Sequence, residues 1–358
     1  MSFLSSVAMA PRDPILGLNE QFAADPNPSK VNLGVGVYFD SEGKLPLLNC
    51  VARAQAQLLA APKPKGYLPI DGIAAYDMAV QHLVFGAGHP AVTGKRIATV
   101  QALGGTGGLK VGADFLKRLD PAKPVLISDP SWENHRALFT NAGFDVQTYP
   151  YYDAATRGVR FDDLLAALGR AEPGSVVVLH ACCHNPTGCD LTPDQWAQVV
   201  QAVGSQGLVA FLDMAYQGFG EGIAEDGALV QQFLDAGLDF LVATSFSKSF
   251  SLYGERVGAL SVVCGSADEA ARVLSQLKIV IRTSYSNPPT FGAQVVAAVL
   301  TTPPLRMLWE QELAGMRQRI RAMRHALVAR LQSAGVTQDL SYITRQKGMF
   351  SYSGLGTA

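Results

Sequence analysis

The sequence predicts an α/β fold in which one mostly parallel sheet is wrapped by helices, and three observations support this prediction. Short apolar runs rich in β-branched residues recur along the middle of the chain, with helical patterns between them. The chain has 358 residues, a length that is enough for two domains, and its 48% hydrophobic and 16% charged residues are typical of a globular protein. The two ends differ in pattern from the middle, which indicates a smaller α/β domain built from both ends.

Seven apolar runs are expected to be strands of the seven-stranded sheet, because strands buried on both faces are almost continuously hydrophobic. These runs are residues 97–100, 125–128, 146–149, 176–180, 209–213, 240–244 and 259–263. Residues 305–334 predict a long amphipathic helix with arginines on its solvent-exposed face, and residues 342–353 resemble a strand. We therefore expect a large domain at 47–314. Residues 1–46 would form an N-terminal arm and part of the small domain, which 315–358 would continue.

Charge and composition exclude several classes of function. The formal net charge is -1, so no basic excess points to nucleic acid, and a small-molecule ligand is expected instead. No apolar run is long enough to span a membrane. Five cysteines, two of them adjacent, do not form a disulfide framework, and residues 1–10 lack the basic start and apolar length of a signal peptide. We therefore expect a cytoplasmic protein.

A glycine-rich run at 104–108 (Gly-Gly-Thr-Gly-Gly) follows the first predicted strand and precedes a helical pattern at 109–119. Glycines let backbone N–H groups approach an anion, and a helix N-terminus adds a positive partial charge. The run therefore predicts a phosphate-binding loop, with a tight turn that binds nothing as the alternative. The spacing does not match a dinucleotide-binding fingerprint.

Residues 182–189 (Cys-Cys-His-Asn-Pro-Thr-Gly-Cys) include possible metal ligands. Adjacent residues at a strand end should point in opposite directions, and no second ligand pair occurs elsewhere in the sequence, so we expect no metal site. Asn185 instead follows a buried strand. Its side-chain amide should enter the crevice at the carboxyl ends of the strands, where open α/β sheets bind ligands.

Asp213 ends another apolar run, and Tyr216 follows three residues later. A buried carboxylate is costly unless it meets a cation. The protonated nitrogen of a pyridine cofactor is such a cation, because the ring needs a negative partner to act as an electron sink. An aspartate that caps a helix N-terminus is the alternative.

Lys248 belongs to the stretch Ser245-Phe246-Ser247-Lys248, which follows a predicted strand, with Arg256 a short way on. A lysine in an apolar pocket near other cations loses its proton readily and becomes a nucleophile for a carbonyl group. Two hydroxyls and a guanidinium suit a phosphate. The alternative is an ordinary surface lysine.

Taken together and in this order, the motifs resemble the class I aspartate and aromatic-amino-acid aminotransferases of fold type I, which use pyridoxal phosphate. The resemblance runs from residues 13–18 (Asp-Pro-Ile-Leu-Gly-Leu) to 348–354 (Gly-Met-Phe-Ser-Tyr-Ser-Gly). Residues 245–258 (Ser-Phe-Ser-Lys-Ser-Phe-Ser-Leu-Tyr-Gly-Glu-Arg-Val-Gly) and 215–220 (Ala-Tyr-Gln-Gly-Phe-Gly) are most similar to the bacterial aromatic, or tyrosine, branch.

The resemblance implies three catalytic residues. Lys248 would carry the cofactor as a Schiff base and move the substrate proton, Asp213 would keep the pyridine nitrogen protonated, and Tyr216 would bind the phenolic oxygen together with Asn185. The remaining cofactor contacts would come from Gly105, Thr106, Ser245, Ser247 and Arg256 at the phosphate, Trp132 stacked on the ring, and Tyr67 reaching the phosphate from the neighbouring subunit.

The resemblance also implies a homodimer with shared sites. Arg282 would cross the interface to meet a distal substrate carboxylate, and His135 would support Asp213 from behind. The substrate would contact Gly36, Trp132, Asn185 and Arg282. Family members continue several dozen residues beyond the equivalent of Ala358 and bind the substrate α-carboxylate with an arginine in a Ser-Gly-Arg stretch. No arginine of this sequence matches that motif.

The expected reaction is a ping-pong transamination of tyrosine, phenylalanine, aspartate and glutamate with 2-oxoglutarate. An aspartate-preferring aminotransferase is one alternative, and another pyridoxal phosphate enzyme, such as a decarboxylase or lyase, is a second. A third is a regulator that uses the same fold to sense an effector. It would need a basic helix-turn-helix module, for which residues 1–46 have neither the length nor the charge.

Overall fold

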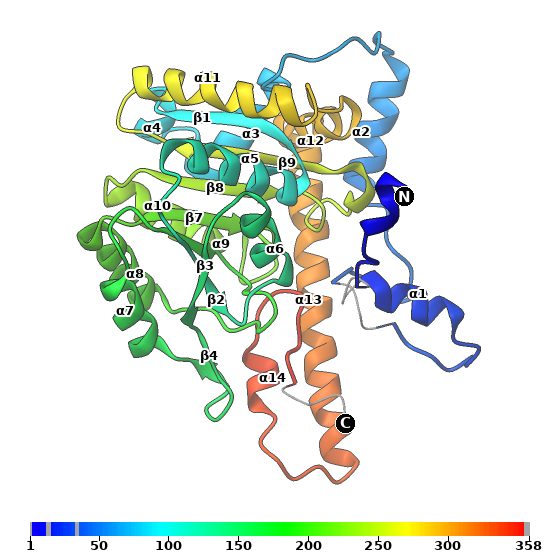
Figure 1. Ribbon diagram of the computed structural model, residues 1–358. Helices are drawn as coiled ribbons and strands as arrows, with labels where there is room; N and C mark the ends of the chain where they lie inside the picture. Colours follow the sequence, from blue (N-terminus) through cyan, green and yellow to red (C-terminus); the bar gives the residue numbers. More distant parts are fainter. Residues whose placement is uncertain (1, 12–15, 33–35, 354–358) are drawn as a thin grey trace.

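A seven-stranded sheet forms the centre of the computed structural model, which describes residues 2–11, 16–32 and 36–353 (Figure 1). The strand order is β1-β9-β8-β7-β6-β2-β3. Strand β9 runs antiparallel to both of its neighbours, and the other pairs are parallel, so the prediction of a mostly parallel sheet is confirmed. All seven predicted strands form: β1 (Ile97–Leu103), β2 (Val125–Asp129), β3 (Val146–Pro150), β6 (Val176–His180), β7 (Val209–Met214), β8 (Phe240–Ser245) and β9 (Val257–Val263). A short hairpin of β4 (Tyr152–Asp153) and β5 (Gly158–Val159) lies outside this sheet.

Helices cover both faces of the sheet, which explains why its strands are apolar throughout. Every residue of β8 and β9 is buried. One core cluster packs the sheet against α5 (Gly104–Leu119), α6 (Glu133–Asn141) and α11 (Ala267–Ser284). The larger cluster packs the other face against α2 (Asn49–Ala60), α3 (Ala74–Gln81), α7 (Phe161–Arg170), α8 (Pro193–Gln206), α10 (Ala228–Asp235) and α12 (Phe291–Thr301).

The long helix expected near the C-terminus is α13 (Pro303–Ser333), and it leaves the sheet layer to run beside α14 (Ser341–Arg345) (Figure 1). The domain boundary proposed at 314 falls inside this continuous helix. Helix α1 (Leu16–Ala24) was not predicted from the sequence. No helix in the described ranges is long and apolar enough to cross a lipid bilayer.

The strand expected at 342–353 is wrong. Residues 341–345 form α14, and residues 346–353 pair with no strand in the described part of the chain. The physical reason lies in the backbone carbonyls of Gln346, Gly348 and Phe350, which accept hydrogen bonds from the guanidinium of Arg324. These carbonyls are therefore not available to a sheet.

Candidate active site

Most of the predicted site residues gather at one edge of the sheet, where the parallel strands end. Asp213 lies in β7 and Ser245 ends β8, while Trp132 and Asn185 follow β2 and β6. Arg256 precedes β9, which begins at this same edge because it runs antiparallel to β8. Ligands of open α/β sheets bind at such an edge. The strand order and directions therefore bring these residues to one edge of the sheet, the edge that the sequence predicted for Asn185.

The glycine-rich run is the first turn of α5 rather than a separate loop. The first turn of a helix has backbone N–H groups without intrahelical partners, so Gly105 and Thr106 can still offer donors to an anion. Gly104 has φ +68, and a Cβ there would lie 2.5 Å from Nη2 of Arg256. The glycine therefore allows the guanidinium to lie directly against the start of the helix.

Two serine hydroxyls complete this group of donors. The Oγ of Ser247 accepts a hydrogen bond from Nη1 of Arg256 at 3.4 Å, and the Oγ of Ser245 accepts one from the backbone N–H of Ser247 at 3.3 Å. Within the described ranges no carboxylate pairs with Arg256, whose only other acceptor is the carbonyl of Tyr253 at 2.9 Å. The first turn of α5, the hydroxyls and the guanidinium thus form a cationic cup suited to a phosphate.

Lys248 is partly buried, and its Nζ lies 4.9 Å from the centre of the Tyr216 ring. Burial lowers the pKa of this ammonium group, the charge of Asp213 opposes the shift, and Arg256 adds to it. In the described residues no carboxylate forms an ion pair with its Nζ. The alternative of an ordinary surface lysine is therefore wrong, and the lowered pKa makes the uncharged, nucleophilic amine more accessible.

Asp213 is only 6% exposed, and its Oδ2 lies 2.9 Å from Nε2 of His135. Burial would raise the pKa of Asp213, but the hydrogen bond and charge of His135 reverse the shift and bring the pKa below 3.8. The other carboxylate oxygen has no hydrogen-bond partner in the described part of the chain. Since Asp213 lies within a strand, the alternative of a helix cap is wrong. The carboxylate can accept a cationic N–H from a ligand.

His135 lies behind Asp213, where the resemblance placed it, but the two buried polar groups beyond it, Ser131 and His180, were not predicted from the sequence. His135 Nδ1 lies 2.8 Å from the hydroxyl of Ser131, which is 3.4 Å from Nε2 of His180. Burial, with the charge of His135, lowers the pKa of His180 to about 3, so this ring is neutral. The position of His180 at the end of an apolar strand was the only signal in the sequence. These hydrogen-bonded side chains fix the orientation of the His135 ring, and so the position of the Asp213 carboxylate.

Tyr216 is buried against the ring of Phe350, for which no role was predicted from the sequence. Phe350 meets it edge to face, with ring centres 5.5 Å apart. A Cβ on Gly36 would lie 3.0 Å from the Phe350 ring and 3.7 Å from the Tyr216 hydroxyl. Gly36 therefore lies against both side chains. Burial raises the pKa of Tyr216 well above its ordinary value, so it stays protonated and can donate a hydrogen bond. Trp132 meets His135 edge to face nearby, at 5.3 Å.

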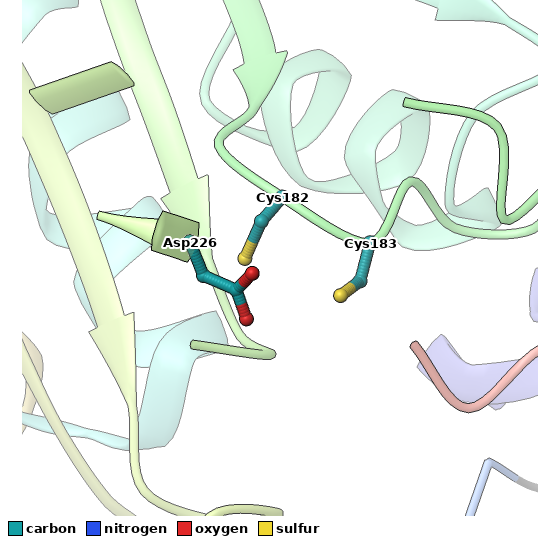
Figure 2. Close-up of side chains that lie close together, drawn as sticks. All are labelled: Cys182, Cys183 and Asp226. Carbon is teal, nitrogen blue, oxygen red and sulfur yellow. The ribbon is translucent and has the colours of Figure 1, made fainter. Parts of the chain in front are cut away.

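The argument that Cys182 and Cys183 point apart is wrong. Their sulfur atoms and the carboxylate of Asp226 lie within 4.8 Å of one another and point into one buried space (Figure 2). The strand has already ended at His180, and Cys183 has φ 55, which turns the chain. The group has the ligand types of a metal site. However, the Asp226 oxygens already accept three backbone N–H groups, from Gly218, Gly220 and Glu221.

Tyr67 and Arg282 lie on the surface rather than in this site. Tyr67 is 96% exposed, and the exposed Arg282 donates a hydrogen bond to the hydroxyl of Ser286. The side chain of Asn287 donates to the carbonyl of Leu68 at 3.0 Å, so the segments that carry Tyr67 and Arg282 are neighbours. In the described residues no hydrogen bond or ion pair joins either side chain to the site.

Known proteins resemble this chain over almost its whole length. The family model described as aminotransferase class I and II matches residues 28–358. An aspartate aminotransferase of Pseudomonas aeruginosa is 62% identical over 355 residues, which are 99% of this chain and 89% of the relative. An aromatic-amino-acid aminotransferase of Escherichia coli is 53% identical and covers 97% of this chain and 87% of its own length. The crystal structure of an aromatic-amino-acid aminotransferase from Burkholderia pseudomallei, covalently bound to pyridoxal phosphate, superposes with a TM-score of 0.97. It has 64% sequence identity and covers 99% of this chain and 89% of its own.

Proposed function

The chain belongs to the class I and II aminotransferases, and we propose that it transfers the amino group of aromatic and dicarboxylic amino acids to 2-oxoglutarate. One observation carries the proposal: a lysine with a lowered pKa lies between a cationic cup and a buried carboxylate. Pyridoxal phosphate, the cofactor of this family, has an anionic phosphate, a reactive aldehyde and a basic ring nitrogen, and it supplies an electron sink for the substrate.

The residues present fit this cofactor. The start of α5, at Gly105 and Thr106, would bind the phosphate together with Ser245, Ser247 and Arg256. The unpartnered oxygen of Asp213 would accept the N–H of the pyridinium ring. Tyr216 and Asn185 would donate to the phenolic oxygen, and Trp132 would lie on the ring face. Each assignment uses a donor or acceptor that still has capacity within the described ranges.

Lys248 is the proposed acid and base of the reaction. With its pKa lowered by burial, Nζ would act as the base that takes the proton from the substrate Cα and then as the acid that gives this proton back, while the bound cofactor would supply the electron sink. His135 holds the carboxylate of Asp213 in place, and the lowered pKa of Asp213 keeps it charged at neutral pH. That negative charge would keep the ring nitrogen of the bound cofactor protonated, which would strengthen the electron sink.

The substrate choice is tested by steady-state assays with aspartate and phenylalanine, each with 2-oxoglutarate. Wild-type protein should use both. The substitution Arg282→Ala should lower kcat/KM for aspartate about 100-fold, because a bidentate arginine–carboxylate pair is lost, and should change kcat/KM for phenylalanine much less. Arg330→Ala, an exposed arginine on α13, is the matched control. Equal losses for both substrates would show that Arg282 does not select the side chain.

A homodimer with shared sites is also part of the proposal, because Tyr67 and Arg282 face outwards. Mixing inactive Lys248→Ala with Arg282→Ala protein and letting subunits exchange tests it. Each mixed dimer would contain one intact site, so aspartate turnover should recover to about a quarter of the wild-type rate. If each site were built within one subunit, mixing would restore nothing, and both interface assignments would be wrong.

A further inference from the structure

The carboxylate of Asp190 binds two consecutive backbone N–H groups directly before Asn185. Its Oδ2 accepts a hydrogen bond from the N–H of Cys183 at 2.7 Å, and its Oδ1 accepts one from the N–H of His184 at 2.8 Å. Cys183 has φ 55, and a residue in this left-handed region turns successive N–H groups to the same side, where they form a concave site for an anion. Burial raises the pKa of Asp190, and these two N–H donors oppose the shift. Both carboxylate oxygens are therefore engaged by the backbone of the loop.

The side chain and carbonyl of His184 hold the same loop through a second set of contacts. Its Nε2 lies 2.9 Å from the hydroxyl of Ser128 in β2, and its Nδ1 lies 2.9 Å from the hydroxyl of Thr187. The ring stacks on that of Tyr151, with ring centres 3.9 Å apart. The carbonyl of His184 accepts the N–H of Gly188 at 2.7 Å, which closes the loop into a turn. The loop is therefore anchored both before and after its tip.

Asn185 lies at the tip of this anchored loop. Residues 181–184 and 187–188 are buried, whereas Asn185 is partly exposed. Its side-chain amide forms no hydrogen bond in the described part of the chain, so it is available to a ligand at this edge of the sheet. The direction of the amide depends on the backbone that precedes it. Asp190 holds that backbone, because it binds the N–H groups of the two preceding residues.

We propose that Asp190 is a positioning residue that sets the side-chain amide of Asn185 against the phenolic oxygen of the cofactor. This inference rests on the proposed function and deepens it, because it names a residue that acts on the cofactor through another. A hydrogen bond to the negatively charged phenolic oxygen stabilises that charge, and the bond weakens steeply when its donor is displaced or tilted. The charge on the phenolic oxygen should therefore depend on Asp190, although both oxygens of Asp190 are engaged by the loop.

The test follows the absorbance of the cofactor-loaded protein against pH, which reports the protonation of the group that Lys248 forms with pyridoxal phosphate. Asn185→Ala should raise the pH of half-change by about one pH unit, because a donor that favours the deprotonated, more negative form is lost. Asp190→Asn should raise it by about half a pH unit, because asparagine keeps one acceptor and turns an N–H₂ group towards the other backbone N–H. Asp153→Asn is the matched control and should leave it unchanged. Asp153 also accepts a backbone N–H, from Ala155 at 2.9 Å, but it lies in the β4–β5 hairpin.

A double variant distinguishes positioning from a general loosening of the protein. Because both changes act through the same amide, Asp190→Asn combined with Asn185→Ala should shift the pH of half-change no further than Asn185→Ala alone. A further shift in the double variant overturns the inference alone, and so does an unchanged Asp190→Asn protein when Asn185→Ala is shifted. An unshifted Asn185→Ala protein, or wild-type protein that takes up no pyridoxal phosphate, overturns the proposed function as well.

A second variant keeps the inference testable if Asp190→Asn does not fold. Asp190→Glu keeps both acceptor oxygens but moves them by one methylene group. It should shift the pH of half-change in the same direction as Asn185→Ala and by a smaller amount, because the loop must move to keep its hydrogen bonds. An Asp190→Glu protein with the wild-type pH of half-change overturns the inference.

Discussion

Replacing Lys248 by alanine is expected to lower kcat/KM for transamination about ten-thousand-fold, because both a nucleophile and a positioned acid–base group are lost. The cofactor itself should still bind, since the phosphate cup and Asp213 do not depend on this side chain. Steady-state assays with aspartate and phenylalanine, at equal measured cofactor content, provide the comparison.

Two controls make this result specific. Lys248→Arg keeps a positive charge but offers no uncharged amine, so it should be as inactive as the alanine variant. Lys110→Ala removes a half-buried lysine that pairs with Asp114, and it should retain almost full activity. A Lys248→Ala enzyme that keeps more than about a tenth of the wild-type rate would show that another group moves the proton.

Replacing Asp213 by asparagine is expected to lower kcat on the order of 100-fold to 1,000-fold, because a buried charge that stabilises the reacting ring is removed. Asparagine keeps the size of the side chain and can still pair with His135. The loss therefore reports the charge and not the packing. Rapid-mixing measurements of a single half-reaction separate this effect from substrate binding.

Asp213→Glu is the matched control, since it keeps the charge and moves it by one methylene group. It should retain more activity than the asparagine variant. The hydrogen bond and charge of His135 hold the pKa of Asp213 below its ordinary value, so the wild-type rate should show no loss attributable to this carboxylate between pH 5 and 8. An asparagine variant as fast as the wild type would mean that the ring nitrogen needs no anionic partner.

The sheet could be predicted from the sequence because its strands are buried on both faces. All seven apolar runs became strands, and the residues at their carboxyl ends met at one edge. Asp213 and Lys248 were predictable for a related reason. An ionisable residue directly after an apolar strand has few structural roles, and both side chains proved buried or partly buried. Their assignment to the cofactor came from the resemblance and stays a proposal, as does the division into domains.

Other features depended on contacts that a pattern of residue types does not contain. The turn at Cys183, with φ 55, brought two thiols together that strand geometry would separate. The segment 346–353 is apolar enough for a strand, but Arg324, more than twenty residues earlier, binds its carbonyls. The glycines at 104–108 predict a phosphate-binding loop between strand and helix, yet they form the first turn of α5 itself and allow Arg256 to approach.

Borohydride reduction of the cofactor-loaded protein, followed by proteolysis and mass mapping of the modified peptide, identifies the lysine that binds the cofactor. One pyridoxal phosphate per chain should become fixed, and the modified residue should be Lys248, whose pKa is lowered by burial at the edge of the sheet. The Lys248→Ala variant should incorporate none, although it still binds the cofactor reversibly. Recovery of the label on any other lysine of the wild-type protein would contradict the account.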